Sequence, residues 1–105
     1  MRIFHYLAAD GRDVFQDWLD GVRDLRARLA VQRRVDRLGR GNFGDHAFCR
    51  EGVWELRVDV GAGYRVYYAL SGETGLLLCG GSKRTQDSDI SRAVDCWRDY
   101  VRRRK

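Results

Sequence analysis

The hydrophobic and polar residues of this chain follow two spacings, the two-residue period of strands and the 3.6-residue period of helices. Residues 2–7 form an aromatic and β-branched run, which predicts a first strand. Apolar residues then recur at helical spacing over residues 14–22. Asp10 or Asp13 is placed to cap this helix, because a carboxylate accepts hydrogen bonds from the free backbone N–H groups of the first turn. Gly21 predicts a break at its end.

A second helix is predicted to face the core with four aliphatic residues, Leu25, Leu29, Val35 and Leu38. Arginine fills much of the remaining surface: Arg23, Arg26, Arg28, Arg33, Arg34, Arg37 and Arg40. The simplest interpretation is a solvated outer face, and a surface facing RNA or the ribosome is the alternative. Glycines between positions 39 and 44 end the helix, because glycine readily adopts the positive φ found there.

From residue 45 onward the period changes to two, which predicts strands at 46–50, 54–60, 64–70 and 76–79. A last amphipathic helix begins near residue 85, with an apolar stripe of Ile90, Ala93, Val94, Trp97 and Val101. The predicted order is β-α-α-β-β-β-β-α. We therefore expect a single α+β domain over residues 1–105, with an antiparallel sheet meander and its helices packed on one face.

Composition narrows the classes of function. The 105 residues carry 20 Lys plus Arg against 15 Asp plus Glu, a formal net charge of +5. Only Lys83 and Lys105 are lysines, and the planar guanidinium of arginine suits bidentate contact with phosphate. A polyanionic partner is indicated, although a solubility role or an acidic protein partner fits the same charge.

Cysteine and histidine usage argues against a metal site or a disulfide scaffold. The three cysteines are widely spaced without a CxxC pair, and His5 and His46 are isolated. We expect no metal and no cofactor. No apolar run approaches the about 20 residues that span a bilayer, so we expect no membrane association and a cytoplasmic location.

Candidate chemistry lies on the polar face of the predicted meander. Alternation directs Arg57, Arg65 and Tyr67 to one face, and Lys83 and Arg84 follow the neighbouring strand. We expect these cations to form a concave phosphate-binding surface without an acidic cluster nearby. The alternative is an ordinary solvated strand face whose arginines pair with acidic residues of the same hairpin.

Each of these residues has an expected role in cleaving RNA, where the 2′-hydroxyl supplies the nucleophile. Arg65 would clamp the transition state because its charge is fixed at physiological pH. Lys83 would bind phosphate or transfer a proton, and Arg57 and Arg84 would bind RNA. Tyr67 would stack on a base or donate a proton. Glu55 is the one acidic exception, and it could orient one of the arginines.

Four segments resemble the HigB-like branch of the RelE/ParE toxins, also known as addiction module killer proteins. They are residues 41–45, 52–58, 63–68 and 76–83, followed by Gln86, Asp89 and Ile90. The resemblance implies a RelE-like fold and a type II toxin that cuts mRNA on the ribosome as a metal-independent endoribonuclease. It also implies a small helix-turn-helix antitoxin as partner. By position, Arg57 and Arg65 match catalytic basic strand positions, and Lys83 and Arg84 match a basic pair after the next strand.

The chain departs from this family pattern at two points. The tyrosine or histidine that some relatives place near the carboxyl terminus for proton transfer has no clear equivalent, so the general base stays open. The usual Gly-Pro-Gly turn is Gly61-Ala62-Gly63 here. Two other functions therefore remain open: a non-enzymatic, ParE-like inhibitor of DNA gyrase, and an RNA-binding domain that no longer cleaves.

Overall fold

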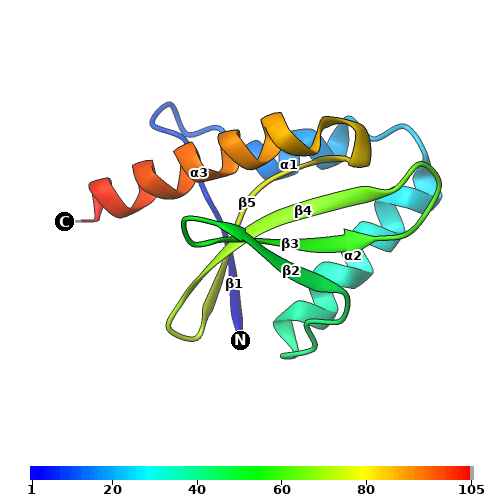
Figure 1. Cartoon of the computed structure of the whole chain (residues 1–105), viewed down its shortest axis with the longest axis horizontal. Helices are drawn as coiled ribbons and strands as arrows, with labels where there is room; N and C mark the ends of the chain where they lie inside the picture. Colours follow the sequence, from blue (N-terminus) through cyan, green and yellow to red (C-terminus); the bar gives the residue numbers. More distant parts are fainter. Residues whose placement is uncertain (105) are drawn as a thin grey trace.

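Five strands form one sheet, and three α-helices pack against it in the computed structural model, which describes residues 1–104 (Figure 1). The elements in chain order are β1 (Arg2–His5), α1 (Val14–Asp20), α2 (Leu25–Gly39), β2 (His46–Arg50), β3 (Val53–Val58), β4 (Tyr64–Ser71), β5 (Thr74–Ser82), a 3-10 turn η1 (Lys83–Thr85) and α3 (Gln86–Arg103). The predicted mixed α+β class is confirmed.

The strand order across the sheet is β1-β5-β4-β3-β2. Strands β2 to β5 pair with their sequence neighbours in antiparallel fashion, as predicted. Strand β1 instead pairs with β5 in parallel, so the prediction of a wholly antiparallel meander is wrong at this edge. The reason is that α1 and α2 carry the chain from β1 to the opposite edge, and the meander then returns to β1 strand by strand.

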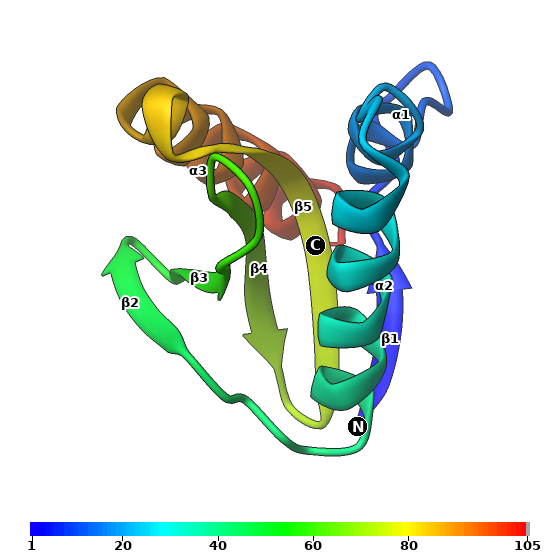
Figure 2. The same cartoon turned by 90° about the vertical axis from the view of Figure 1, so that its right-hand side faces the viewer.

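The helices cover both faces of the sheet, which corrects the expectation that they lie on one. Side chains of α1 and α2 form one apolar cluster with the sheet, and side chains of α3 form a second cluster. Figure 2 shows α3 on one side of β5 and α2 on the other. The physical reason is that β5 buries the successive residues Leu76, Leu77, Leu78 and Cys79, so apolar side chains leave both of its faces.

Helix ends agree with the sequence prediction, whereas the inner side of α2 does not. Asp13 caps α1 by accepting from the N–H of Gln16 at 3.0 Å, and α1 ends at Gly21. In α2 the buried stripe is Ala27, Val31, Arg34, Val35 and Leu38. Leu25 and Leu29 were expected inside but are 61% and 48% exposed, because they lie two positions away from this stripe on the helix.

Candidate functional site

The β3–β4 hairpin places Arg57 directly opposite Arg65. Their Cα atoms are register partners, two residues along the hairpin from the pair formed by Glu55 and Tyr67. Because side chains alternate along a strand, these four residues project from the same face of the sheet. That face is the one covered in part by α3, since Tyr67 packs in the same apolar cluster as Ala93 and Val94.

A pocket of about 290 Å³ opens beside this arginine pair. Its lining comes from the hairpin, the loop before β2 and the turn η1: Asp45, Arg57, Asp59, Gly61, Ala62, Gly63, Arg65 and Lys83. Lys83 reaches the pocket because its N–H donates to the Gly63 carbonyl at 3.1 Å. We call this the hairpin pocket. The structure thus brings together three of the predicted cations.

Glu55 is a buried carboxylate that contacts both arginines. Its side chain is 4% exposed, and its Oε2 atom lies 3.0 Å from Nε of Arg57 and 3.0 Å from Nε of Arg65. The Arg57 contact is a hydrogen bond, whereas the Nε–H of Arg65 is not directed at the oxygen, so that contact is an ion pair alone. Its Oε1 atom accepts from Gln86 Nε2 at 3.0 Å. Glu55 therefore contacts both arginines, not one.

Acidic residues surround the cations, which corrects the expectation of a surface without an acidic cluster. Asp45 and Asp59 line the hairpin pocket, and Asp45 Oδ1 lies 3.3 Å from Nη1 of Arg57. The pKa of Arg57 is raised, first by its hydrogen bond to Glu55 and by the charge of that carboxylate. The strand alternation could not show this because Asp45 comes from a loop that is distant in sequence. The charge pairing foreseen in the alternative interpretation is present.

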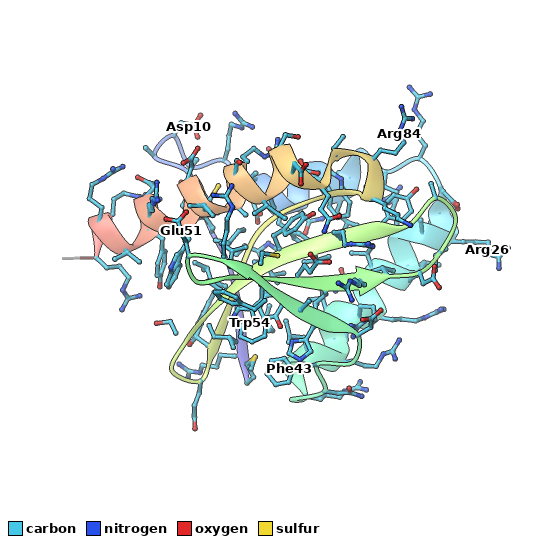
Figure 3. The ribbon with its side chains drawn as sticks, in the orientation of Figure 1. Asp10, Arg26, Phe43, Glu51, Trp54 and Arg84 are labelled. Carbon is cyan, nitrogen blue, oxygen red and sulfur yellow. The ribbon has the colours of Figure 1, made fainter. Side chains whose placement is uncertain are left out.

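Tyr67 and Arg84 do not line the hairpin pocket. Tyr67 is 0% exposed, so its ring has no free face for a nucleobase, and burial raises the pKa of its hydroxyl. Its Oη atom has no hydrogen-bond partner within residues 1–104. Arg84 lies at the amino end of α3, directed outward, where it borders a separate shallow depression (Figure 3).

Arg34 supports the site from beneath and was not distinguished by the sequence from its exposed neighbours. Its guanidinium is buried and donates to three carbonyl groups: Phe43 at 2.9 Å, Asp45 at 3.1 Å and Arg57 at 3.3 Å. Burial lowers its pKa, with repulsion from Arg37 as the second cause. Gly44, at φ +57, packs directly against this guanidinium, and a Cβ there would lie 2.8 Å from Nη1 of Arg34. Arg34 thus fixes the loop that carries Asp45.

The histidines and cysteines take structural places. His5 Nδ1 lies 2.7 Å from Asp13, and the His46 ring stacks between two other aromatic rings. Burial raises the pKa of the Cys49 and Cys79 thiols to about 12. Within residues 1–104 no group of His, Cys, Asp and Glu is arranged to hold a metal ion, and no helix is long and apolar enough to cross a membrane.

Comparison with known proteins gives a relative in Haemophilus influenzae. It is 48% identical over 82 residues, which cover 75% of this chain and 81% of the relative. The chain belongs to the family of this protein. No protein-family model matches the chain. The relative bears the name "Uncharacterized protein", so membership in this family does not indicate a chemical activity.

The hairpin pocket is suited to an oxyanion, because three cationic side chains border it from three different segments. The side chains of Arg65 and Arg57 are 13% and 40% exposed, so one cation is largely buried and the other is accessible. Lys83 is exposed at the rim. Fixed positive charges around a small, partly enclosed space stabilise negative charge that develops on a bound group.

Proposed function

We propose that this protein is a RelE/ParE-type toxin of the HigB-like branch, with a RelE-like fold, and that it cleaves mRNA on the ribosome. The observation that carries the proposal is the convergence of Arg57, Arg65 and Lys83 on the hairpin pocket. The mixed α+β fold, with a five-stranded sheet and three helices, is compatible with the RelE-like fold that the resemblance implies. The proposal includes a cytoplasmic location and a helix-turn-helix antitoxin as partner.

The proposed reaction needs no nucleophile from the protein. The ribose 2′-oxygen attacks the adjacent phosphorus, the bond to the 5′-oxygen breaks, and a 2′,3′-cyclic phosphate and a 5′-hydroxyl result. Arg65 and Arg57 would stabilise the charge on the phosphorane-like transition state. Lys83 would protonate the leaving 5′-oxygen, and Asp45 or Asp59, the carboxylates of the pocket, would accept the 2′-hydroxyl proton.

Primer extension on translated mRNA tests this function. We expect codon-phased cuts with the wild-type protein, and loss of a fixed transition-state cation in Arg65→Ala should slow cleavage by about 100-fold or more. Lys83→Ala is a second variant that avoids the core, because Lys83 is exposed. Arg12→Ala is the matched control, since Arg12 is exposed and outside the hairpin pocket. Equal growth inhibition by wild type and Arg65→Ala would refute the catalytic role.

One observation favours a second function, the non-enzymatic inhibition of DNA gyrase. Glu55 pairs with both arginines, and Asp45 pairs with Arg57, so the two arginines already have partners in the free protein. A surface of paired charges fits protein recognition as well as phosphate chemistry. Supercoiling assays with purified gyrase separate the two functions, because only an inhibitor of gyrase reduces supercoiling without cutting translated mRNA.

A further inference from the structure

The two arginines of the hairpin pocket stand in an unfavourable position relative to each other. Arg57 and Arg65 are direct cross-strand partners, and like charges directly opposite each other on a sheet are destabilising. Burial adds to the problem, because the side chain of Arg65 is only 13% exposed and loses most of its hydration. Some group must hold these side chains together.

Glu55 is that group, and its surroundings hold it in place. One oxygen, Oε2, is 3.0 Å from Nε of each arginine. The other oxygen, Oε1, accepts from Gln86 at 3.0 Å and lies 3.4 Å from Sγ of Cys49. The carboxylate is thereby contacted from β2, β3, β4 and α3, and little freedom remains for it to turn.

The hydrogen bond to Glu55 also decides which edge of the Arg57 guanidinium faces outward. A guanidinium is planar, so a partner at Nε fixes the plane of the group. Glu55 accepts a hydrogen bond from Nε of Arg57, which leaves the terminal nitrogens of Arg57 for other partners. It holds the Arg65 guanidinium beside it through an ion pair, with Oε2 3.0 Å from Nε. Nη1 of Arg57 contacts the exposed Asp45, and Nη1 of Arg65 makes only a long 3.4 Å hydrogen bond, to the Tyr64 carbonyl.

We infer that Glu55 is a positioning residue, which holds Arg57 and Arg65 side by side with their terminal nitrogens presented to a phosphate in the hairpin pocket. Its effect on catalysis rests on the proposed function. It acts through the arginines, because the carboxylate is buried and both of its oxygens are engaged within the protein. Gln86 extends the same network to α3, so the arginines and the helix that follows Lys83 share one anchor.

The first test measures the arginines themselves and needs no RNA. In ¹⁵N-labelled protein, NMR follows the Nε–H signals of Arg57 and Arg65 and their exchange with water. Glu55→Gln keeps the shape and removes the charge, so we expect exchange of the Arg57 Nε–H, which donates to Glu55, to accelerate about 10-fold or more. The Arg65 Nε–H faces the charge without donating to it, so its signal should change in chemical shift. Glu51→Gln is a matched control, because Glu51 also pairs with two arginines, Arg50 and Arg98, but on the exposed surface.

The second test measures single-turnover cleavage of mRNA on programmed ribosomes. We expect Glu55→Gln to lower the cleavage rate at saturation by about 100-fold, while the concentration for half-saturation changes by less than about threefold, because the cations remain but are misplaced. Glu51→Gln should cleave like the wild type. If Glu55→Gln does not fold, Glu55→Asp keeps the charge, withdraws the carboxylate by one methylene, and should show the same loss of rate.

The two tests fail in different ways. Unchanged Nε–H exchange in Glu55→Gln would overturn the positioning role whatever the function of the protein. Wild-type and Glu55→Gln proteins that cleave equally would overturn its importance for catalysis. Absence of cleavage by the wild type would overturn the proposed function and the catalytic effect of Glu55 with it, while the exchange measurement still decides whether Glu55 holds the arginines.

Discussion

Gly81 lies where β5 meets the start of α3, and it leaves no room for a side chain. A Cβ at this position would overlap the carboxylate of Asp89, at 2.6 Å from Cγ, and would lie 3.1 Å from Oγ1 of Thr85. To reach an ordinary contact of 3.4 Å, the carboxylate carbon must retreat by about 0.8 Å, and Oδ2, which lies closer still, must move further. Asp89 is 8% exposed and accepts a 2.5 Å hydrogen bond from Thr85, so the retreat breaks a buried contact.

Gly81→Ala should therefore destabilise the protein markedly. Overpacking costs about 1–3 kcal/mol, and the loss of a hydrogen bond to a buried carboxylate costs about 1.5–3 kcal/mol. With partial relaxation we expect the free energy of unfolding to fall by about 3 kcal/mol. For a domain of this size that corresponds to a decrease in Tm of roughly 12–24 °C. Urea unfolding followed by tryptophan fluorescence, with a thermal melt by circular dichroism, measures both quantities.

Gly21→Ala is the control for this substitution. A Cβ at Gly21 would lie 3.4 Å from the Trp18 carbonyl, an ordinary contact, and the residue has φ −82. We expect a change below about 1 kcal/mol in either direction. If Gly81→Ala also stays within about 1 kcal/mol of the wild type, the close packing of Gly81 against Asp89 is wrong.

Three further substitutions test other parts of the structure. Arg34→Met removes a buried guanidinium from three carbonyls and should lower the free energy of unfolding by about 3 kcal/mol in urea titrations; an unchanged midpoint would contradict it. Tyr67→Phe removes a hydroxyl that has no hydrogen-bond partner among residues 1–104, so stability should stay equal or rise by up to about 1 kcal/mol, and a clear loss would contradict the absence of a partner. The Tyr6 hydroxyl lowers the pKa of Asp99, so its stabilising effect is present above the ordinary carboxyl pKa and lost as pH falls through the lowered value. Unfolding titrations between pH 7 and pH 3 should show the difference between wild type and Tyr6→Phe shrinking towards acid; a constant difference would exclude this contact.

Local patterns in the sequence predict the elements well, because each pattern reflects the period of one helix or strand. Asp13 as a cap, the end of α1 at Gly21 and the antiparallel β3–β4 hairpin all follow from neighbouring residues. The parallel pairing of β1 with β5 joins segments about 70 residues apart, and no local pattern encodes it. The two-sided burial of β5 did have a signal, since an unbroken apolar run is typical of a strand covered on both faces.

The candidate site was predicted in part for the same reason. Strand alternation is sufficient to place Arg57 and Arg65 on one face, and the hairpin turn brings them together. Alternation does not show how deeply a side chain is buried. We therefore expected the Tyr67 ring to be accessible to RNA, although it is 0% exposed. Asp45 and Arg34 reach the site through tertiary packing. Nothing in the sequence distinguishes the buried Arg34 from the exposed arginines of the same helix.

Attracting a polyanion and stabilising a transition state make different demands on the charged residues. In this protein, with its net charge of +5, the charges suited to each lie in different places. In the hairpin pocket three cations face Asp45 and Asp59, with Glu55 beneath, so the site itself is close to neutral. The excess positive charge lies elsewhere, above all on α2, which carries five arginines, all but the buried Arg34 on its outer surface, and one aspartate. Attraction of a polyanion depends on such an extended charge and acts over about 10 Å at 0.1 M salt, whereas stabilising a transition state depends on charges fixed at the reacting atoms. Under the proposed function, α2 would therefore concentrate RNA at the protein, and the arginines held by Glu55 would act on the phosphate. A pocket of three unpaired cations would attract RNA more strongly, but its arginines would repel each other and lose the fixed geometry on which the chemistry depends.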